Sequence, residues 1–180
     1  MVPNKLLDKY LKGIKDGDKD ALANLYNETK SSVYAYALSI LKNKALAEEV
    51  LQDTFVNIYE NANLYNSNNK PLAWILTITK NNALMKLRKE KNNIDIDLFK
   101  ETISNTKDNI DNKLFLSYLF EHVSDSEREI VLLHAISGFH HREIATFLNL
   151  PLGTVLSKYK RTLNKLKSIA KEDTDEKQKN

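Results

Sequence analysis

The sequence REIATFLNLPLGTVLSKYKRTL, from Arg142 to Leu163, decides the fold of the C-terminal part of the chain. Its first half has the three- and four-residue apolar spacing of a short helix, and Ala145 is a small residue at which a second helix can cross closely. A proline and a glycine then interrupt the pattern, so we predict a turn at Leu150–Gly153, with Thr154 as an early cap of the next helix. Four apolar residues are spaced to be buried between the two helices: Ile144, Leu148, Leu150 and Val155. The pattern predicts a helix-turn-helix.

The helix after this turn has two different sides. Its inward side is predicted to carry the stripe Val155, Tyr159, Thr162, Leu163 and Leu166. Its other side is polar and basic, and no acidic residue occurs from Leu150 to Lys167. A helix fits the major groove of B-DNA, where residues near its N-terminus reach base edges and flanking lysines neutralise phosphates. We therefore predict DNA contacts from Thr154, Leu156, Ser157, Lys158, Lys160, Arg161 and Lys165.

The same residues also fit a three-helix subdomain with a solvated basic face, because the helix dipole favours lysines in a last turn. Lys158 favours this alternative, since it lies three residues after Val155, where many such motifs bury an aliphatic side chain. The coincidence of a small residue, a turn and a valine with an acid-free helix nevertheless favours DNA binding.

The composition indicates a helical protein. The 180 residues suit one or two small domains, and 42% hydrophobic residues suffice for a packed core. Only 4 glycines and 3 prolines are present, too few for a protein rich in tight turns. Cysteine is absent, which excludes disulfides, thiolate zinc sites and cysteine nucleophiles. Because no apolar stretch approaches about 20 residues and the N-terminus lacks a signal-like core, we expect a cytoplasmic protein without membrane insertion.

Helical spacing continues along most of the chain. Helices are predicted over residues 5–17, 18–42, 43–65, 72–92, 112–123, 124–137 and 141–149, besides the helix after the turn. The predicted apolar stripes include Tyr59 and Leu84, and Ser124 with Glu127 has the spacing of a capping box.

The periodicity fades between residues 92 and 111, where five acidic residues stand against two lysines. We therefore predict an all-α protein made of two small helical domains, 1–91 and 112–171. A flexible acidic linker over 92–111 joins them, the second ends in the helix-turn-helix, and a charged tail follows at 172–180.

Both halves together resemble bacterial sigma factors of the extracytoplasmic-function group. ALAEEVLQDTFVNIY (45–59) looks like the family's helix that docks on RNA polymerase. LYNSNNKPLAWILTITKNNALMKLRKEK (64–91) looks like the element that opens and holds the −10 promoter region, and residues 124–167 look like the −35-reading domain. The resemblance covers about residues 5–91 and 113–168, with a variable linker between them as in the family.

The resemblance implies a polymerase-binding site and a −10 site. Contacts to the polymerase are expected from Glu48, Glu49, Gln52, Asp53 and Phe55. Contacts to the −10 strand are expected from Tyr65, Asn66, Ser67, Asn68, Asn69, Trp74, Lys80, Asn81 and Arg88. Aromatic rings and amides suit this role, because unpaired bases are held by stacking and base-edge hydrogen bonds. The alternatives are a core aromatic for Trp74, compositional drift for the asparagines and plain solvation for the acidic face.

Three residues depart from the family pattern. Leu156 stands where many relatives carry a basic base-reading residue, Met85 where many carry Asp, and Asp125 where Pro is common. Leu156 affects which −35 sequence the protein is expected to read, because a leucine offers only apolar contact, for example to a thymine methyl group.

Three other functions compete with this interpretation. A transcription regulator of the quorum-sensing response type has a similar helix-turn-helix, but it leaves the first half unexplained. An enzyme is disfavoured, because the four histidines lack metal-site spacing and no phosphate loop or nucleophile elbow occurs. A purely protein-binding adaptor predicts no DNA affinity. We expect core RNA polymerase and promoter DNA as partners, and no cofactor, metal or small-molecule substrate. The resemblance also implies an anti-sigma factor as a further partner.

Overall fold

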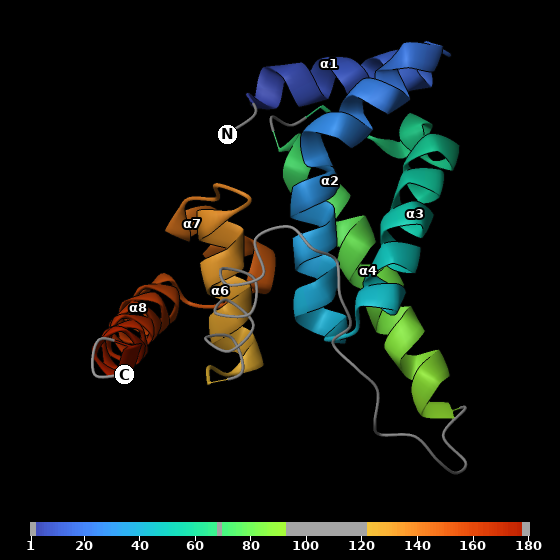
Figure 1. Cartoon of the computed structure of the whole chain (residues 1–180). Helices are drawn as coiled ribbons and strands as arrows, with labels where there is room; N and C mark the ends of the chain where they lie inside the picture. Colours follow the sequence, from blue (N-terminus) through green and yellow to red (C-terminus); the bar gives the residue numbers. More distant parts are fainter. Residues whose placement is uncertain (1–2, 68–69, 93–121, 178–180) are drawn as a thin grey trace. The chain divides into compact units, whose positions relative to one another are not determined.

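The computed structural model describes residues 3–67, 70–92 and 122–177, without the side chains of residues 91–92 and 169–177. Every regular element in this part of the chain is helical, which confirms the predicted all-α class. The elements are α1 (Asn4–Lys15), α2 (Lys19–Leu41), α3 (Lys44–Glu60), η1 (Ala62–Leu64), α4 (Pro71–Asn92), α6 (Asp125–Ala135), α7 (His141–Leu148) and α8 (Leu152–Lys177) (Figure 1). None of the helices within these ranges combines the length and apolar character that a bilayer crossing requires.

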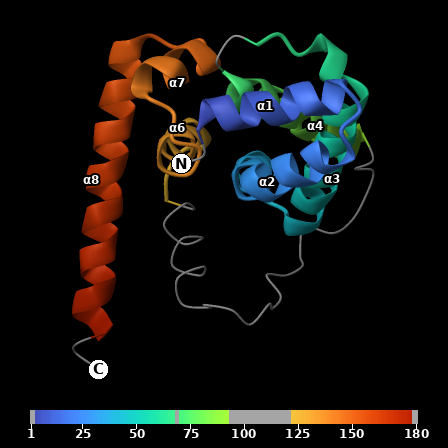
Figure 2. The same ribbon diagram turned by 90° about the horizontal axis from the view of Figure 1, so that it is seen from above.

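The chain divides into two compact units. The first contains residues 1–93 with Leu132–Phe139, and the second contains residues 94–131 and 140–180. In the first unit α2, α3 and α4 lie side by side and α1 crosses one end of them (Figure 1). In the second unit α7 packs against the N-terminal end of α8 (Figure 2). Nearly all of the linker predicted over 92–111 and most of the helix predicted over 112–123 lie outside the described residues, so the predicted domain limits stay predictions.

Short polar residues cap the N-termini of α2 and α3 in the first unit. Asp18 precedes α2 and its carboxylate accepts a hydrogen bond from the Asp20 amide at 2.9 Å. Asn43 does the same for α3, accepting from the Leu46 amide at 3.1 Å. Gly17, with φ +83°, turns the chain between α1 and α2 in a conformation that a side chain would strain. These signals explain why the predicted starts of α2 and α3 agree with the structure within one residue, whereas α3 ends at Glu60, five residues before the predicted limit.

The core of the first unit is built from fully buried aliphatic side chains on all four helices. Leu11 of α1, Leu25 of α2, Ile58 of α3 and Leu76 of α4 are each 0% exposed. Burying each one contributes about 1.5–3 kcal/mol relative to leaving it in water. Small residues bring the helices close: Ala37, Ala47 and Ala83 form one buried cluster with Val50 and Leu41. A Cβ atom at Gly13 would lie only 3.0 Å from that of Ala21, so α1 and α2 also need a small residue where they meet.

Two predicted core residues are in fact exposed. Tyr59 on α3 is 64% exposed and Leu84 on α4 is 38% exposed. The apolar spacing alone could not separate them from the stripe, because each lies next to a buried neighbour, Ile58 and Ala83 respectively. Both predictions are wrong, and Tyr59 instead adds an aromatic surface to α3.

A buried amide network joins α3 to α4. Asn57 donates to the side-chain oxygen of Asn82 at 2.9 Å, and Asn82 donates to the Thr54 hydroxyl at 3.4 Å. Thr54 in turn donates to the Val50 carbonyl at 2.7 Å. Asn82 is 7% exposed and Thr54 is 0% exposed, so these polar groups are satisfied inside the unit. The network sets which residues of α4 face α3 and leaves Asn81 on the outside.

Candidate nucleic-acid interface

The turn between α7 and α8 is one residue earlier and shorter than predicted. α7 ends at Leu148, and its C-cap is Asn149, whose φ of +53° is tolerated by asparagine better than by most residues. The Leu150 amide then donates to the Ala145 carbonyl at 2.9 Å. Pro151 accepts from the amides of Thr154 and Val155, so α8 begins at Leu152. Leu152 and Gly153 therefore lie in the helix rather than in the turn, and Thr154 is in the first turn rather than at its cap.

The inward side of α8 agrees with the predicted stripe. Val155 is 0% exposed and Thr162 is 1% exposed, while Tyr159, Leu163 and Leu166 are half-buried. The Tyr159 ring meets the His141 ring edge-on, with 4.6 Å between the ring centroids. Because this side is held by α7, the opposite side of α8 is presented in a defined orientation.

The opposite side of α8 carries exposed residues suited to a DNA groove. Leu156 is 46% exposed, and Ser157, Lys160, Arg161 and Lys165 are also exposed. Ser157 donates to the Thr154 carbonyl at 3.1 Å, and Thr154 itself is half-buried. Leu152, 36% exposed, lies one turn before Leu156 and was not among the predicted DNA contacts.

Lys158 differs from the other predicted lysines. It is half-buried, and its Nζ donates to the Ser126 hydroxyl of α6 at 2.7 Å. The position three residues after Val155 therefore faces inward, as many helix-turn-helix motifs require, and the lysine reaches a polar partner there. This contact takes Lys158 off the open face that carries Lys160 and Lys165.

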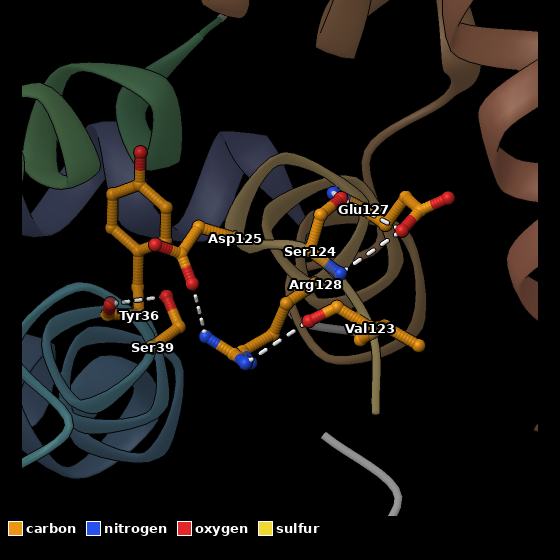
Figure 3. Close-up of polar contacts among 7 residues, drawn as sticks. All are labelled: Tyr36, Ser39, Val123, Ser124, Asp125, Glu127 and Arg128. Carbon is orange, nitrogen blue, oxygen red and sulfur yellow. Dashed lines mark hydrogen bonds and ion pairs between the residues drawn. The ribbon is translucent and has the colours of Figure 1, made fainter. Parts of the chain in front are cut away.

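The start of α6 is fixed by the predicted capping box (Figure 3). Glu127 accepts hydrogen bonds from the Ser124 amide at 3.0 Å and the Ser124 hydroxyl at 2.7 Å, and the Glu127 amide donates back to that hydroxyl at 3.4 Å. These bonds lower the pKa of Glu127, and the charges of Arg161 and Lys165 lower it further. The buried Arg128 pairs with Asp125 at 2.8 Å and donates to the Val123 carbonyl at 3.3 Å.

The candidate −10 residues differ in their exposure to solvent. Asn66, Ser67, Asn81 and Arg88 are exposed, whereas Trp74 and Lys80 are half-buried. Asn68 and Asn69 lie outside the described residues.

Tyr65 does not match the expected exposed stacking platform. It is 7% exposed, its hydroxyl donates to Asp8 at 2.8 Å, and its ring centroid lies 5.2 Å from that of Trp74. Tyr65 therefore anchors the segment between η1 and α4 to the core, because burial leaves its ring little surface on which a base could stack. Asp8 was not among the predicted site residues, because nothing in the sequence links α1 to a segment 57 residues away.

The candidate polymerase-binding residues lie on α3. Glu48, Glu49, Gln52 and Asp53 are exposed, but Phe55 is 6% exposed and packs edge-on against Tyr26 with 4.9 Å between centroids. Phe55 therefore supports this face from inside the core and is not available as a surface contact. Two residues that the prediction omitted, Val56 at 54% exposure and Tyr59, are exposed beside the acids.

Glu49 also pairs with Lys86 of α4. This ion pair raises the pKa of Lys86, with smaller contributions from Asp53 and Glu90. Lys86 is thus turned toward α3, while Arg88 and Lys89, near the C-terminal end of α4, are exposed. In the described part of the chain, no group of three or more side chains could hold a metal ion.

Two family models match the chain, one to each half. The model described as Sigma-70 region 2 matches residues 25–93, and the model described as Sigma-70, region 4 matches residues 116–166. The helix-turn-helix lies inside the second match, and α3 and α4 lie inside the first. The match to the first half disfavours the regulator of the quorum-sensing type, which leaves that half unexplained.

Curated relatives align over most of their length. The ECF RNA polymerase sigma factor SigK of Mycobacterium sp. (strain KMS) is 24% identical over 172 residues, covering 90% of this chain and 89% of the relative. SigK of Mycobacterium ulcerans (strain Agy99) is 23% identical, covering 90% of this chain and 92% of the relative.

Solved structures share the fold. CnrH, in complex with the cytosolic domain of CnrY, has a TM-score of 0.65 at 20% identity and covers 95% of this chain and 98% of its own. The sigma factor RpoE of Bartonella quintana, in complex with the anti-sigma factor NepR, has a TM-score of 0.68 at 22% identity and covers 83% of this chain and 96% of its own.

The two region models together match more than half of the chain, in the order expected from the resemblance. The chain therefore belongs to the sigma-70 family, as a sigma factor of the extracytoplasmic-function group that directs promoter-specific transcription initiation with core RNA polymerase on promoter DNA.

Proposed function

We propose that this sigma factor divides its work among three surfaces. The exposed side of α8 reads the −35 element as duplex, the exposed side of α3 binds core polymerase, and the Tyr65–Ser67 segment with α4 holds the melted −10 strand. The observation that carries the proposal is the division of α8, where Val155 and Thr162 are buried while Leu156 and Arg161 are exposed. A helix held on one side and polar on the other can enter a major groove.

On α8 the exposed residues have separate roles. Arg161 and Lys160 offer donors to base edges or phosphates, and Lys165 offers a charge to the phosphate backbone. Leu156 makes apolar contact, which favours a thymine methyl group at the base that it meets. Lys158 is left out of this proposal as a base reader, because it is bonded to Ser126.

On the first unit the −10 strand meets amides and a cation. Asn66 and Asn81 carry exposed amides that can bond to unpaired base edges, and Arg88 can contact phosphates. Trp74 is half-buried against Tyr65, so only part of its ring is open for stacking.

The α3 surface combines charge with apolar area. Glu48, Glu49, Gln52 and Asp53 form its polar part, and Val56 and Tyr59 add exposed apolar side chains. A mixture of acids and an aromatic is suited to a protein partner, because aromatic residues supply much of the energy at interfaces. The protein acts by binding in the cytoplasm and performs no catalysis itself. An anti-sigma factor is a further partner, which is supported by the similar structure of RpoE, solved in complex with the anti-sigma factor NepR.

Transcription in vitro with purified bacterial core polymerase tests the proposal. Fragmented genomic DNA serves as template, and transcript ends are mapped with and without the protein. Transcripts that start at discrete sites only when the protein is present, with a shared −35 and −10 sequence, are the expected result. DNA binding without core binding would point to the regulator alternative, and core binding without discrete start sites would exclude promoter recognition.

A further inference from the structure

Asp8 of α1 makes three contacts that tie α1 to the segment between η1 and α4. Its Oδ1 atom accepts hydrogen bonds from the Tyr65 hydroxyl at 2.8 Å and from the Ser67 hydroxyl at 2.5 Å. Its Oδ2 atom pairs with Lys12 Nζ at 2.7 Å. One carboxylate thus holds the two residues that flank Asn66.

The backbone explains why Asn66 is left outside. Tyr65 has extended backbone angles, with φ −66° and ψ 122°. In an extended chain alternate side chains point to opposite sides, so Tyr65 and Ser67 share the side that meets Asp8. Asn66 is exposed, which agrees with a side chain directed away from that contact.

The charges in this cluster favour a stable contact. The hydrogen bond from Lys12, followed by that from Ser67, holds the pKa of Asp8 below its usual range, so the group is a carboxylate at neutral pH. Burial and Asp8 raise the pKa of Tyr65, so its hydroxyl remains a donor. Hydrogen bonds to an ionised acceptor are stronger than neutral ones. Lys12 also offsets a negative charge that would otherwise repel DNA phosphates nearby.

We propose that Asp8 is a positioning residue for −10 recognition, which holds Tyr65 and Ser67 so that Asn66 presents its amide to an unpaired base. This inference rests on the proposed function, in which the Tyr65–Ser67 segment binds the melted −10 strand. A segment that is already held in one conformation loses less freedom when DNA binds, and its amide meets the base in a defined geometry. Asp8 itself touches no base in this arrangement.

A promoter library tests this role. The −10 region of a promoter found with the genomic fragments is randomised, and transcripts made by the reconstituted holoenzyme are sequenced. Asp8→Ala is expected to reduce the preference for the best base at one −10 position on the order of tenfold, the scale of one charge-assisted hydrogen bond. Asp8→Asn should reduce it less, because its amide oxygen can still accept. Asp16→Ala is the matched control, since Asp16 is an exposed acid at the end of the same helix, and it should change nothing.

Removing the hydroxyl donor of Tyr65 or of Ser67 by itself gives a second test of the inference. Tyr65→Phe and Ser67→Ala each delete one hydroxyl, so both should shift the same −10 position as Asp8→Ala. Combined with Asp8→Ala, either should add little, because the contact is already lost. Thermal unfolding and core binding are measured for every variant, and if Asp8→Ala does not fold, these two variants carry the test.

The outcomes separate two failures. If Asn66→Ala alters the −10 preference while Asp8→Ala, Tyr65→Phe and Ser67→Ala lower transcription equally on all sequences, Asp8 only supports the fold and the inference is wrong. If Asn66→Ala also leaves the preference unchanged, the proposed −10 role of the segment fails, and the inference fails with it. A shift at one −10 position with unchanged −35 preference supports both.

Discussion

Arg161 lies on the exposed side of α8, and its charge also acts on Glu127 of α6. Leu156, five residues earlier on the same helix, offers only apolar contact. The proposed −35 readout therefore combines two chemically different side chains.

Arg161→Ala should weaken binding to the preferred −35 duplex by about 1–3 kcal/mol and relax the base preference at one position. The reason is the loss of directed donors at a base edge. Binding to a set of −35 duplexes with single substitutions measures the effect. Lys165→Ala is the matched comparison: it should weaken all duplexes alike and lower the slope of log K against log salt by about 1. An unchanged base preference in Arg161→Ala would exclude this residue as a base reader.

The carboxylate of Asp8 should make part of the folding stability depend on pH. Its pKa in the folded protein lies below the value of 3.8 that it has without partners, so protonation is harder in the folded state. The stability that it contributes is therefore complete well above pH 3.8 and is lost as the pH falls through that value and below. The difference in Tm between the wild type and Asp8→Asn should be constant near neutral pH and shrink in acid. A difference that stays constant through the acid range would contradict this.

At the scale of the elements, two adjacent asparagines of α4 point in different directions, one toward α3 and one toward the surface proposed to bind DNA. Asn82 faces α3 in the buried amide network, and Asn81 faces outward. A helix turns by 100° per residue, so one step along α4 separates the packing role of Asn82 from the DNA-binding role that we propose for Asn81. The helix can present Asn81 reliably only because Asn82 fixes its orientation on α3.

The two asparagines should respond differently to the same substitution. Asn82→Ala should lower the free energy of unfolding by about 1–3 kcal/mol, because the half-buried Asn57 and the buried Thr54 side chains lose a partner. Asn81→Ala should change stability by less than about 0.5 kcal/mol, yet reduce open-complex formation. Urea unfolding and permanganate reactivity of unpaired thymines measure the two effects. Equal loss of stability in both variants would show that Asn81 is also part of the packing.

At the scale of the whole molecule, the proposed surfaces lie on different helices and can be altered separately. The exposed acids of α3 face away from the buried Val50 and Ile58, and the basic side of α8 belongs to the other unit. Charge changes on one surface should therefore leave the folding of the other intact.

Asp53→Lys should weaken binding to core polymerase by at least tenfold and leave binding to an isolated −35 duplex unchanged. Reversing an exposed charge at an interface changes its electrostatic fit with the partner without disturbing the core. Asp16→Lys, an equal charge change on α1, is the control and should retain core binding. Fluorescence anisotropy with labelled core and labelled duplex measures both. Loss of duplex binding in Asp53→Lys would show that the surfaces are not independent.

Much of the fold followed from local sequence signals. Helix limits near Asp18, Asn43 and Ser124 were predictable, because caps and turn residues satisfy or break backbone hydrogen bonds within a few positions. The exposed basic side of α8 was also predictable, because helical periodicity assigns its opposite side to the core.

The sequence by itself thus determined the all-α class, the helix-turn-helix and the region that should contact DNA. Only the tertiary structure decided that Tyr65 and Phe55 are buried supports, that Tyr59 is exposed, and that Lys158 is bonded to Ser126. It also decided that Asp8 meets Tyr65 and Ser67. Periodicity assigns a residue to one side of a helix, but burial and pairing depend on which other element covers that side. Such contacts between distant segments leave no local pattern in the sequence.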